Sequence, residues 1–151
     1  MENANINISR MQKSDLDAVV AIEQVSFSDP WKRSMFLTEV EESNLSIPLV
    51  IKDNNTVIGY AVLWQVIDEM HLGNFAVKPE YRKKHIGSRL LQYIIDMAVE
   101  KKVVKITLEV RQSNTAAINL YQRFGFTAVA IRRKFYTKPA EDGFVMLKSM
   151  V

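Results

Sequence analysis

The chain has 151 residues, of which 48% are hydrophobic and 25% charged, and its formal net charge is +3. This length and composition are typical of one globular domain that buries about 70% of its unfolded surface, and we expect residues 1–151 to form that single domain. The chain contains no cysteine, which excludes disulfides and thiolate chemistry, and its mild positive charge suits an anionic ligand without requiring a nucleic acid.

The N-terminal part of the chain reads as one strand followed by two helices. Residues 6–10 form a short strand pattern, with alternate isoleucines on one face. Ser14-Asp15-Leu16-Asp17 resembles a capping box, which predicts a helix from there through Val25. After a break at residues 27–31, we expect a second helix over about residues 32–42.

The middle of the chain reads as three strands and a long helix. Strands are expected over residues 47–52, 56–66 and about 69–77, and Asp53-Asn54-Asn55 is a hairpin signal between the first two. A helix is expected over residues 86–101, because apolar side chains recur there at helical spacing: Leu90, Leu91, Ile94, Ile95 and Ala98.

The last third adds a strand, a short helix and two more strands. The strand over residues 104–110 looks buried, and the helix runs from Asn114 or Thr115 to Phe124, where Gly125 ends it as a C-terminal cap. The final strands are expected over residues 127–133 and 144–149. This order of elements predicts an α+β sandwich around a mixed sheet.

Nothing in the chain marks it for export or for a membrane. The first 30 residues carry acids and amides among the apolar positions, and no apolar run approaches the roughly 20 residues needed to span a bilayer. We therefore expect a cytoplasmic protein without a membrane partner.

The most informative segment is the loop Arg82-Lys83-Lys84-His85-Ile86-Gly87-Ser88. A strand runs into this basic loop and the loop opens directly into a helix, so several backbone N–H groups and about half a positive charge face outward together. Such a loop predicts a seat for a phosphate or pyrophosphate, with Arg82, Lys83 and Lys84 adding mobile positive charge. P-loop and Rossmann signatures are absent from the sequence.

Two downstream runs complete a wider pattern: Leu108-Glu109-Val110-Arg111-Gln112-Ser113-Asn114 and Leu120-Tyr121-Gln122-Arg123-Phe124-Gly125-Phe126. With the basic loop, they resemble the GNAT superfamily of acetyl-CoA-dependent N-acetyltransferases. The resemblance extends over essentially the whole chain. Within the superfamily it is strongest to the RimI group, bacterial enzymes that acetylate the N-terminal alanine of a small-subunit ribosomal protein.

The resemblance implies the GNAT fold, an α+β arrangement with a mixed, mostly antiparallel central sheet flanked by about four helices. It also implies transfer of acetyl from acetyl-CoA to the N-terminal α-amine, of alanine, on a ribosomal protein, by direct attack in one ternary complex. One alternative keeps the fold and acetylates Lys side chains or small-molecule amines. The other is a CoA- or nucleic-acid-binding module without catalysis.

In that family the main chain beside the loop also holds acetyl-CoA. The backbone of Phe75, Ala76 and Val77 would pair with the pantetheine arm like an added strand, and its N–H groups would polarise the thioester carbonyl. The expected acetyl-CoA-binding residues are Phe75, Ala76, Val77, Arg82, Lys83, Lys84, His85, Ile86, Gly87, Ser88, Asn114 and Tyr121.

One residue departs from the family's loop pattern, Gln/Arg-x-x-Gly-x-Gly/Ala. His85 stands where the family has its first Gly, whose backbone freedom turns N–H groups toward the pyrophosphate. Histidine tolerates positive φ better than most non-glycine residues, so we expect the loop to survive at a small strain cost. The imidazole is either an exposed loop side chain or a direct phosphate contact.

Glu109 is the first candidate for chemistry. It interrupts an apolar strand, where a carboxylate is costly to bury unless it is paired or hydrated. Partial burial would raise its pKa toward that of a general base. The resemblance implies that it takes a proton from the incoming amine through water. The alternative is a structural carboxylate paired with Arg111 or Lys105.

Tyr121 and Asn114 are the next candidates. Tyr121 is either a core aromatic or, as the resemblance implies, the general acid that protonates the departing CoA thiolate. Asn114 suits the N-cap of the helix that follows it, and the family also uses this residue to contact CoA. Both roles of Asn114 are compatible.

The sequence lacks an evident nucleophile, which favours direct transfer of the acetyl group over a covalent acyl-enzyme intermediate. There is no cysteine, and no serine lies in a Gly-x-Ser-x-Gly elbow. The histidines His71 and His85 form no ligand pattern, so no metal is expected. Deprotonating a Lys side chain costs about 3.5 kcal/mol more than deprotonating an α-amine at the same pH, which favours the α-amine for a weakly shifted Glu109.

Residues that contact the peptide substrate are the hardest to predict from the sequence. Asp68 and Glu69, at the start of the third strand, either face a cationic peptide or are solvated turn residues. The basic-aromatic run Arg132-Arg133-Lys134-Phe135-Tyr136 suits RNA, but such clusters are usually solvated strand ends, so nucleic acid is not an expected partner. In the family this segment lies near the peptide entrance, which makes Tyr136 a candidate substrate contact.

Overall fold

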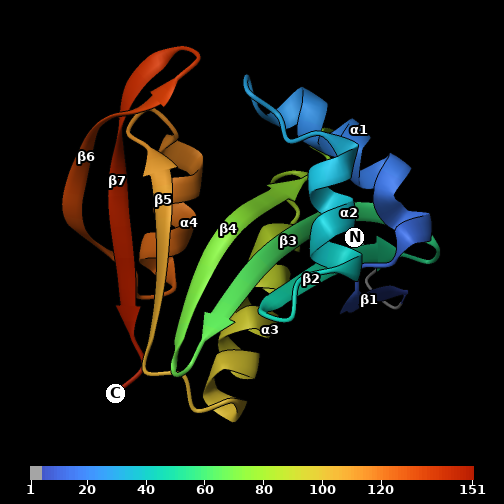
Figure 1. Cartoon of the computed structure of the whole chain (residues 1–151), viewed down its shortest axis with the longest axis horizontal. Coiled ribbons are helices and arrows are strands. Elements are labelled where there is room, and N and C mark those ends of the chain that lie inside the picture. Colours follow the sequence, from blue (N-terminus) through green and yellow to red (C-terminus); the bar gives the residue numbers. More distant parts are fainter. Residues whose placement is uncertain (1–4) are drawn as a thin grey trace.

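The computed structural model describes residues 5–151, which form a seven-stranded sheet with helices on both faces (Figure 1). The strands are β1 (Ile6–Arg10), β2 (Ser46–Asp53), β3 (Thr56–Val66), β4 (Glu69–Val77), β5 (Lys105–Arg111), β6 (Thr127–Thr137) and β7 (Ala140–Ser149). The helices are α1 (Leu16–Ser26), α2 (Arg33–Glu41), α3 (Ile86–Glu100) and α4 (Thr115–Arg123), with short 3₁₀ turns η1 (Lys13–Asp15) and η2 (Pro79–Tyr81). Within residues 5–151, no helix is long and apolar enough to cross a membrane.

The sheet is mixed and mostly antiparallel. Its strand order is β1-β2-β3-β4-β5-β7-β6, and β4 and β5 are the one parallel pair among the described strands. The chain crosses from β4 to β5 through α3, as a parallel connection requires. The predicted α+β fold with about four helices is confirmed.

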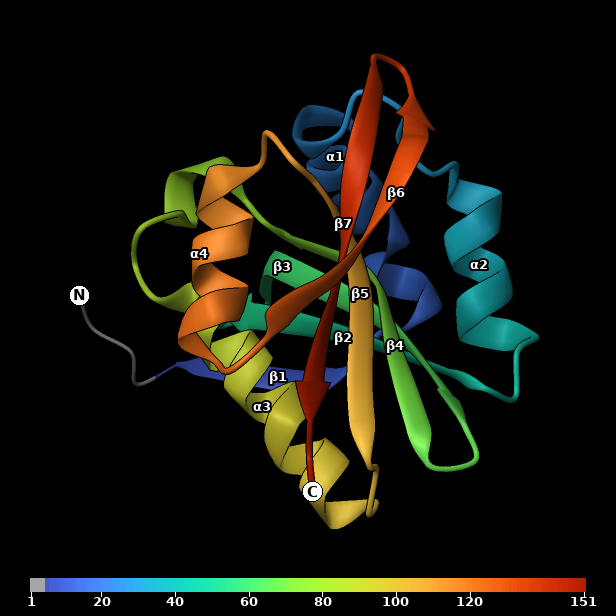
Figure 2. The same ribbon diagram turned by 90° about the vertical axis from the view of Figure 1, so that its left-hand side faces the viewer.

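Two apolar cores lie on opposite faces of the sheet (Figure 2). On one face α3 buries the apolar stripe that its sequence predicts, including Leu90 and Ile94, against β3, β4 and β5. On the other face Leu16 and Val19 of α1 and Phe36 of α2 pack on β2 and β3. The sheet is therefore buried on both faces through its centre, which explains the long apolar runs in β2 and β3.

The parallel strands β4 and β5 stay together for only part of their length. Their ladder runs from Glu69↔Lys105 to Leu72↔Leu108 and then ends, while β4 continues with β3 and β5 continues with β7. Figure 1 shows the two strands diverging from this point. Between β3 and β4 the register shifts at the same level, with Val62 opposite Asn74 and Leu63 opposite Leu72, so Gly73 is an extra, bulged residue.

Most predicted helix ends are confirmed, and the start of α1 is not. Asn114 caps α4, its Oδ1 accepting from the Ala117 N–H at 3.2 Å, and Gly125 follows that helix at φ 92°. The predicted capping box at Ser14–Asp17 is wrong: the carboxylate of Asp15 accepts from the Gln12 N–H at 2.8 Å, so the box lies two residues earlier in the chain than expected. The reason is that η1 precedes α1 and supplies the first turn.

The last hairpin is longer than predicted. β6 continues to Thr137 rather than ending at Arg133, and β7 begins at Ala140 rather than Phe144. Strand pairing is interrupted between Arg132 and Tyr136, where the Lys134 N–H donates to the carboxylate of Asp142 at 2.7 Å. The basic-aromatic run therefore lies in an irregular part of an exposed edge strand, which is why its polar sequence did not read as a strand.

Removing a side chain from the α3 core tests this packing. We expect Leu90→Ala to lower the free energy of unfolding by about 3 kcal/mol, because it leaves a cavity in a fully buried position. Urea denaturation measures the change. Gln92→Ala, on the exposed side of the same helix, is the control and should stay within about 0.5 kcal/mol of the parent. Equal losses for the two variants would contradict the described orientation of α3.

Candidate active site

Glu109 lies in β5 just past the last residue that pairs with β4. Its neighbours Leu108 and Val110 are buried in the α3 core, so strand alternation puts the carboxylate on the opposite face. The Glu109 side chain is 20% exposed, and its Oε1 lies 3.0 Å from His71 Nε2 while its Oε2 lies 3.5 Å from Arg132 Nη1. Each carboxylate oxygen thus has a partner, and the side chain is still partly exposed to water.

Neither structural partner expected for Glu109 pairs with it. Lys105 pairs with Glu69 at 3.6 Å, and Arg111 pairs with Glu141 at 3.1 Å. The prediction of a carboxylate neutralised by either of these residues is therefore wrong. The cationic partner comes instead from the edge strand β6.

Tyr121 and Tyr136 are two phenols that lie near each other in the structure. Tyr121 of α4 is buried against Phe75 and Phe126, at ring-centroid distances of 6.1 and 5.7 Å. Burial, followed by the nearby Tyr136, raises the pKa of Tyr121 well above its ordinary value. Burial and then the charge of Glu109 raise the pKa of Tyr136 to about 12. Both phenols are therefore protonated at neutral pH, and Tyr136 is within electrostatic reach of Glu109 and Tyr121.

The main chain of β4 beyond Leu72 offers an unpaired edge. Phe75, Ala76 and Val77 pair with β3 on one side, but the β5 ladder has already ended on the other. Backbone polar groups that lose a strand partner need another one, and an extended ligand can supply it. The edge leads directly to the basic loop at residues 82–88.

The basic loop has the backbone shape that an anion seat needs. Lys83 and His85 both have left-handed backbone angles, with φ of 61° and 63°, and α3 starts at Ile86. Alternating left- and right-handed residues turn successive N–H groups to one side, and the first N–H groups of the helix point the same way. The expected strained conformation of His85 is confirmed, and its side chain is exposed.

The three cationic side chains of the loop differ in how firmly they are held by hydrogen bonds. Lys83 and Lys84 are exposed, whereas the guanidinium of Arg82 donates to the Val77 carbonyl and to the Ser26 hydroxyl, each at 3.0 Å. Arg82 thus ties the loop to the end of β4 and to α1. A positioning role for Arg82 follows from these contacts, with Lys83 and Lys84 left to face an anion.

Comparison with known proteins identifies the architecture. The profile described as the acetyltransferase (GNAT) family matches residues 16–126. The chain belongs to this family. It is 37% identical over 141 residues to the [ribosomal protein bS18]-alanine N-acetyltransferase of Escherichia coli (strain K12), a match that covers 92% of this chain and 94% of that one. The predicted resemblance to the RimI group is confirmed.

Solved structures agree with the family. The crystal structure of the ribosomal-protein-S18-alanine N-acetyltransferase from Escherichia coli superposes with a TM-score of 0.88 and 33% identity, covering 96% of this acetyltransferase and 94% of that chain. A GNAT family acetyltransferase from Elizabethkingia anophelis, solved with acetyl-CoA bound, has a TM-score of 0.78 and 22% identity over 97% of this chain and 99% of that chain. The second likeness shows the fold alone.

His71 is a candidate site residue of this acetyltransferase that the sequence did not reveal. Besides its contact with Glu109, its Nδ1 lies 2.8 Å from the Thr107 hydroxyl. Nε2 faces the carboxylate and Nδ1 faces the hydroxyl, so the ring is oriented from both of its nitrogens. Strand alternation places His71, Thr107 and Glu109 on one face, but only the β4–β5 register makes them neighbours.

An aromatic wall continues from His71 across the same face. The indole of Trp64 stacks on the imidazole with ring centroids 6.1 Å apart, and Trp31 lies 6.1 Å beyond it. Trp64 rests directly on the backbone of Gly73, since a Cβ at that position would come within 2.0 Å of the indole. The indole N–H donates to Glu39 of α2, which holds the ring in place.

Asp68 and Glu69 lie at the other end of β4 from the gap. Asp68 is in the turn before β4, and Glu69 opens the strand opposite Lys105. The structure does not bring them together with Glu109, and their role as substrate contacts stays a prediction.

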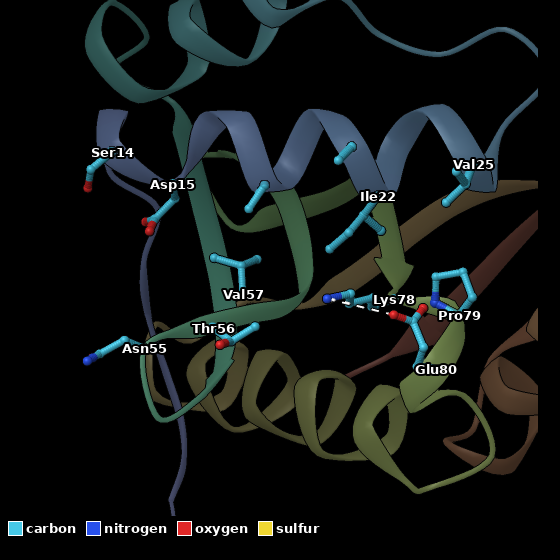
Figure 3. Close-up of a pocket in the computed structure, with 12 residues that line it drawn as sticks. Ser14, Asp15, Ile22, Val25, Asn55, Thr56, Val57, Lys78, Pro79 and Glu80 are labelled. Carbon is cyan, nitrogen blue, oxygen red and sulfur yellow. Dashed lines mark ion pairs between the residues drawn. The ribbon is translucent and has the colours of Figure 1, made fainter.

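A cavity of about 460 Å³ lies apart from these residues, between α1, the β2–β3 turn and η2 (Figure 3). Ile22, Val25 and Val57 line its apolar part, and Lys78 and Glu80 form an ion pair of 3.8 Å at its edge. It contains none of the predicted site residues. In the part of the chain that the structure describes, no group of three or more His, Asp or Glu side chains could hold a metal ion.

Substitutions of His85 test the loop conformation. We expect His85→Val to raise the Kd for acetyl-CoA by about tenfold, because a β-branched residue strongly resists the left-handed conformation. His85→Gly, which adopts it freely, should stay within about threefold of the parent. Isothermal titration calorimetry measures both. Unchanged affinity in the valine variant would show that the loop does not need this backbone shape.

Proposed function

We propose that this acetyltransferase transfers the acetyl group of acetyl-CoA to the N-terminal α-amine of a protein, with alanine as the first residue. The observation that carries the proposal is the 3.0 Å pair of Glu109 and His71 at the point where β4 leaves β5, with Tyr121 packed on Phe75 of the unpaired β4 edge. The name of the E. coli relative supports ribosomal protein bS18 as the substrate, and therefore a cytoplasmic site of action.

Acetyl-CoA fits the surface that leads to this pair. Its pyrophosphate would lie on the backbone N–H groups of residues 83–88, and its pantetheine arm along the unpaired edge of Phe75, Ala76 and Val77. Asn114, at the start of α4, would contact the same arm. The bound cosubstrate supplies an activated thioester carbonyl, which the N–H groups of the β4 edge would polarise.

Glu109 is the proton acceptor in this proposal. As the amine nitrogen bonds to the carbonyl carbon and the carbon–sulfur bond breaks, the nitrogen must lose a proton. Glu109 takes it, directly or through one water molecule, since its carboxylate is partly exposed. His71 holds the carboxylate in place through its Nε2.

Tyr121 acts on the departing sulfur. Burial keeps its phenol protonated, so it is always a donor at neutral pH. A CoA thiolate, with a pKa of about 8.5, is a modest base, so a hydrogen bond that positions the sulfur is a larger part of the effect than full proton transfer. Direct transfer of this kind needs no covalent acyl-enzyme.

An α-amine suits this site better than a Lys side chain. The α-amine has a pKa of about 7.8 and is partly neutral near neutral pH, while a Lys amine at about 10.4 is almost entirely protonated. Tyr136 and the aromatic wall border the carboxylate and would contact the first residues of the peptide. Acetylation of Lys or of small amines by the same site is the alternative.

Removing the two reacting groups tests their roles. We expect Glu109→Gln and Tyr121→Phe each to lower kcat by about two to four orders of magnitude, because each loses a proton-transfer or hydrogen-bonding group without a change of shape. Release of free CoA from acetyl-CoA measures turnover. The matched controls are Glu100→Gln and Tyr93→Phe on α3, which should retain the parent rate. Near-normal turnover in both site variants would refute the assigned roles.

Two peptides of one sequence decide which amine reacts. The first begins with a free alanine, and the second has that amine blocked and carries an internal Lys. We expect turnover on the first peptide alone, because the pKa difference favours the α-amine. Turnover on the blocked peptide would move the enzyme to Lys substrates, and turnover on neither would direct the search to small amines.

A further inference from the structure

Glu23 of α1 is a buried carboxylate that the proposed chemistry does not use. It is 1% exposed, and three hydrogen-bond donors from three other segments converge on it. Its Oε1 accepts from the Tyr60 hydroxyl of β3 and from the Asn74 amide of β4, the latter at 2.9 Å. Its Oε2 accepts from the Trp31 backbone N–H, also at 2.9 Å.

Charge at this position has a cost that the donors only partly offset. Burial raises the pKa of Glu23, and the hydrogen bonds from Trp31, Tyr60 and Asn74 oppose that shift. Among residues 5–151, no Lys or Arg forms an ion pair with it. A costly buried acid outside the reacting groups calls for a reason other than stability.

Two of the three donors belong to the framework of the candidate site. Asn74 is the residue after the bulged Gly73, at the level where β4 separates from β5. Two residues before Gly73, His71 is held by Glu109, so a carboxylate holds the strand on each side of the bulge. Trp31 follows α1 and is the outer member of the aromatic wall on Trp64.

We propose that Glu23 is a positioning residue, which fixes the β4 bulge through Asn74 and the α1–α2 segment through Trp31 relative to each other. Its two carboxylate oxygens keep the acetyl-CoA side of the site, at the β4 bulge, and the peptide side, at Trp31, at a fixed distance from each other. This role rests on the proposed acetyl transfer, in which the bulge faces the thioester and the aromatic wall faces the peptide. A misplacement of about 1 Å between two reactants can lower a rate by about a hundredfold.

A carboxylate suits this role better than its amide. Glutamine has the same shape but only one acceptor oxygen, so either the Trp31 N–H faces an NH₂ group or the Asn74 amide must turn over. The Glu23→Gln variant therefore loosens one of the two connections without emptying the core.

Asp15 supplies the matched control. It is also a buried carboxylate, 5% exposed and next to the start of α1, but it pairs with Lys52 at 2.9 Å and accepts from Gln12, away from the β4–β5 gap. A purely structural role for Glu23 predicts that Glu23→Gln and Asp15→Asn behave alike. A positioning role predicts that they differ in kcat.

The first test compares the two variants by thermal unfolding, by acetyl-CoA titration and by CoA release with the free-alanine peptide. We expect Glu23→Gln to lower kcat by at least about tenfold while the Kd for acetyl-CoA stays within about twofold of the parent. Asp15→Asn should keep the parent kcat, whatever its loss in Tm. Parent-like kcat in Glu23→Gln, or an equal loss in both variants, overturns the proposal.

A second variant keeps the test decisive if Glu23→Gln folds poorly. Asn74→Ala removes the same contact from the β4 side, and we expect a similar loss of kcat from it. If the two residues act through their hydrogen bond, the double variant should lose little more than the worse single variant. If the kcat losses of the two single variants multiply in the double variant, the proposed coupling between Glu23 and Asn74 is wrong.

Hydrogen exchange gives a readout that needs no turnover. In Glu23→Gln we expect the backbone amides of Trp31 and of residues 73–75 to exchange at least about tenfold faster, with α3 amides unchanged. Unchanged exchange at both places overturns the proposal. Because this measurement is independent of substrate, a failure of the proposed acetyl transfer would be seen separately in the peptide assay.

Discussion

The early separation of β4 from β5 is the constraint on which the rest of the structure depends. The two parallel strands pair from Glu69↔Lys105 to Leu72↔Leu108, after which β4 stays with β3 and β5 stays with β7. The extra residue Gly73 increases the local twist of β4 at this level. The divergence leaves an open main-chain edge in the middle of the protein, and Glu109, the Phe75–Val77 segment and the basic loop border it or lead to it.

Two carboxylates near this edge differ in their surroundings. Glu109 is partly exposed and has cationic or ionisable neighbours in His71 and Arg132, so water or a substrate can reach its carboxylate. Glu23 is sealed in the α1–α2 core and held by neutral donors. Similar side chains on one face of a sheet are thus suited to different tasks by access to water and by the kind of partner.

Local patterns predicted the elements and the residues that act within one segment. The apolar stripe of α3, the N-cap at Asn114 and the glycine after α4 depend only on near neighbours in the chain, and all three are confirmed. Glu109 and Tyr121 were identified as candidates through the resemblance to the GNAT family. Contacts between distant strands were not predictable, since the His71–Glu109 pair requires the β4–β5 register and the Arg132 contact requires the irregular pairing of β6. Glu23 was missed because a polar residue in an amphipathic helix is ordinarily exposed.

Because Trp64 packs directly on the backbone of Gly73, the residue at each of these positions limits which residue the other can be. Any side chain added at residue 73 would overlap the indole, whose nearest atom would lie 2.0 Å from the new Cβ. Loss of the indole alone would leave bare backbone beside His71 and free the carboxylate of Glu39. A larger residue at 73 therefore requires either that the indole moves off the strand or that a smaller residue stands at 64, so we expect substitutions at the two positions to be coupled.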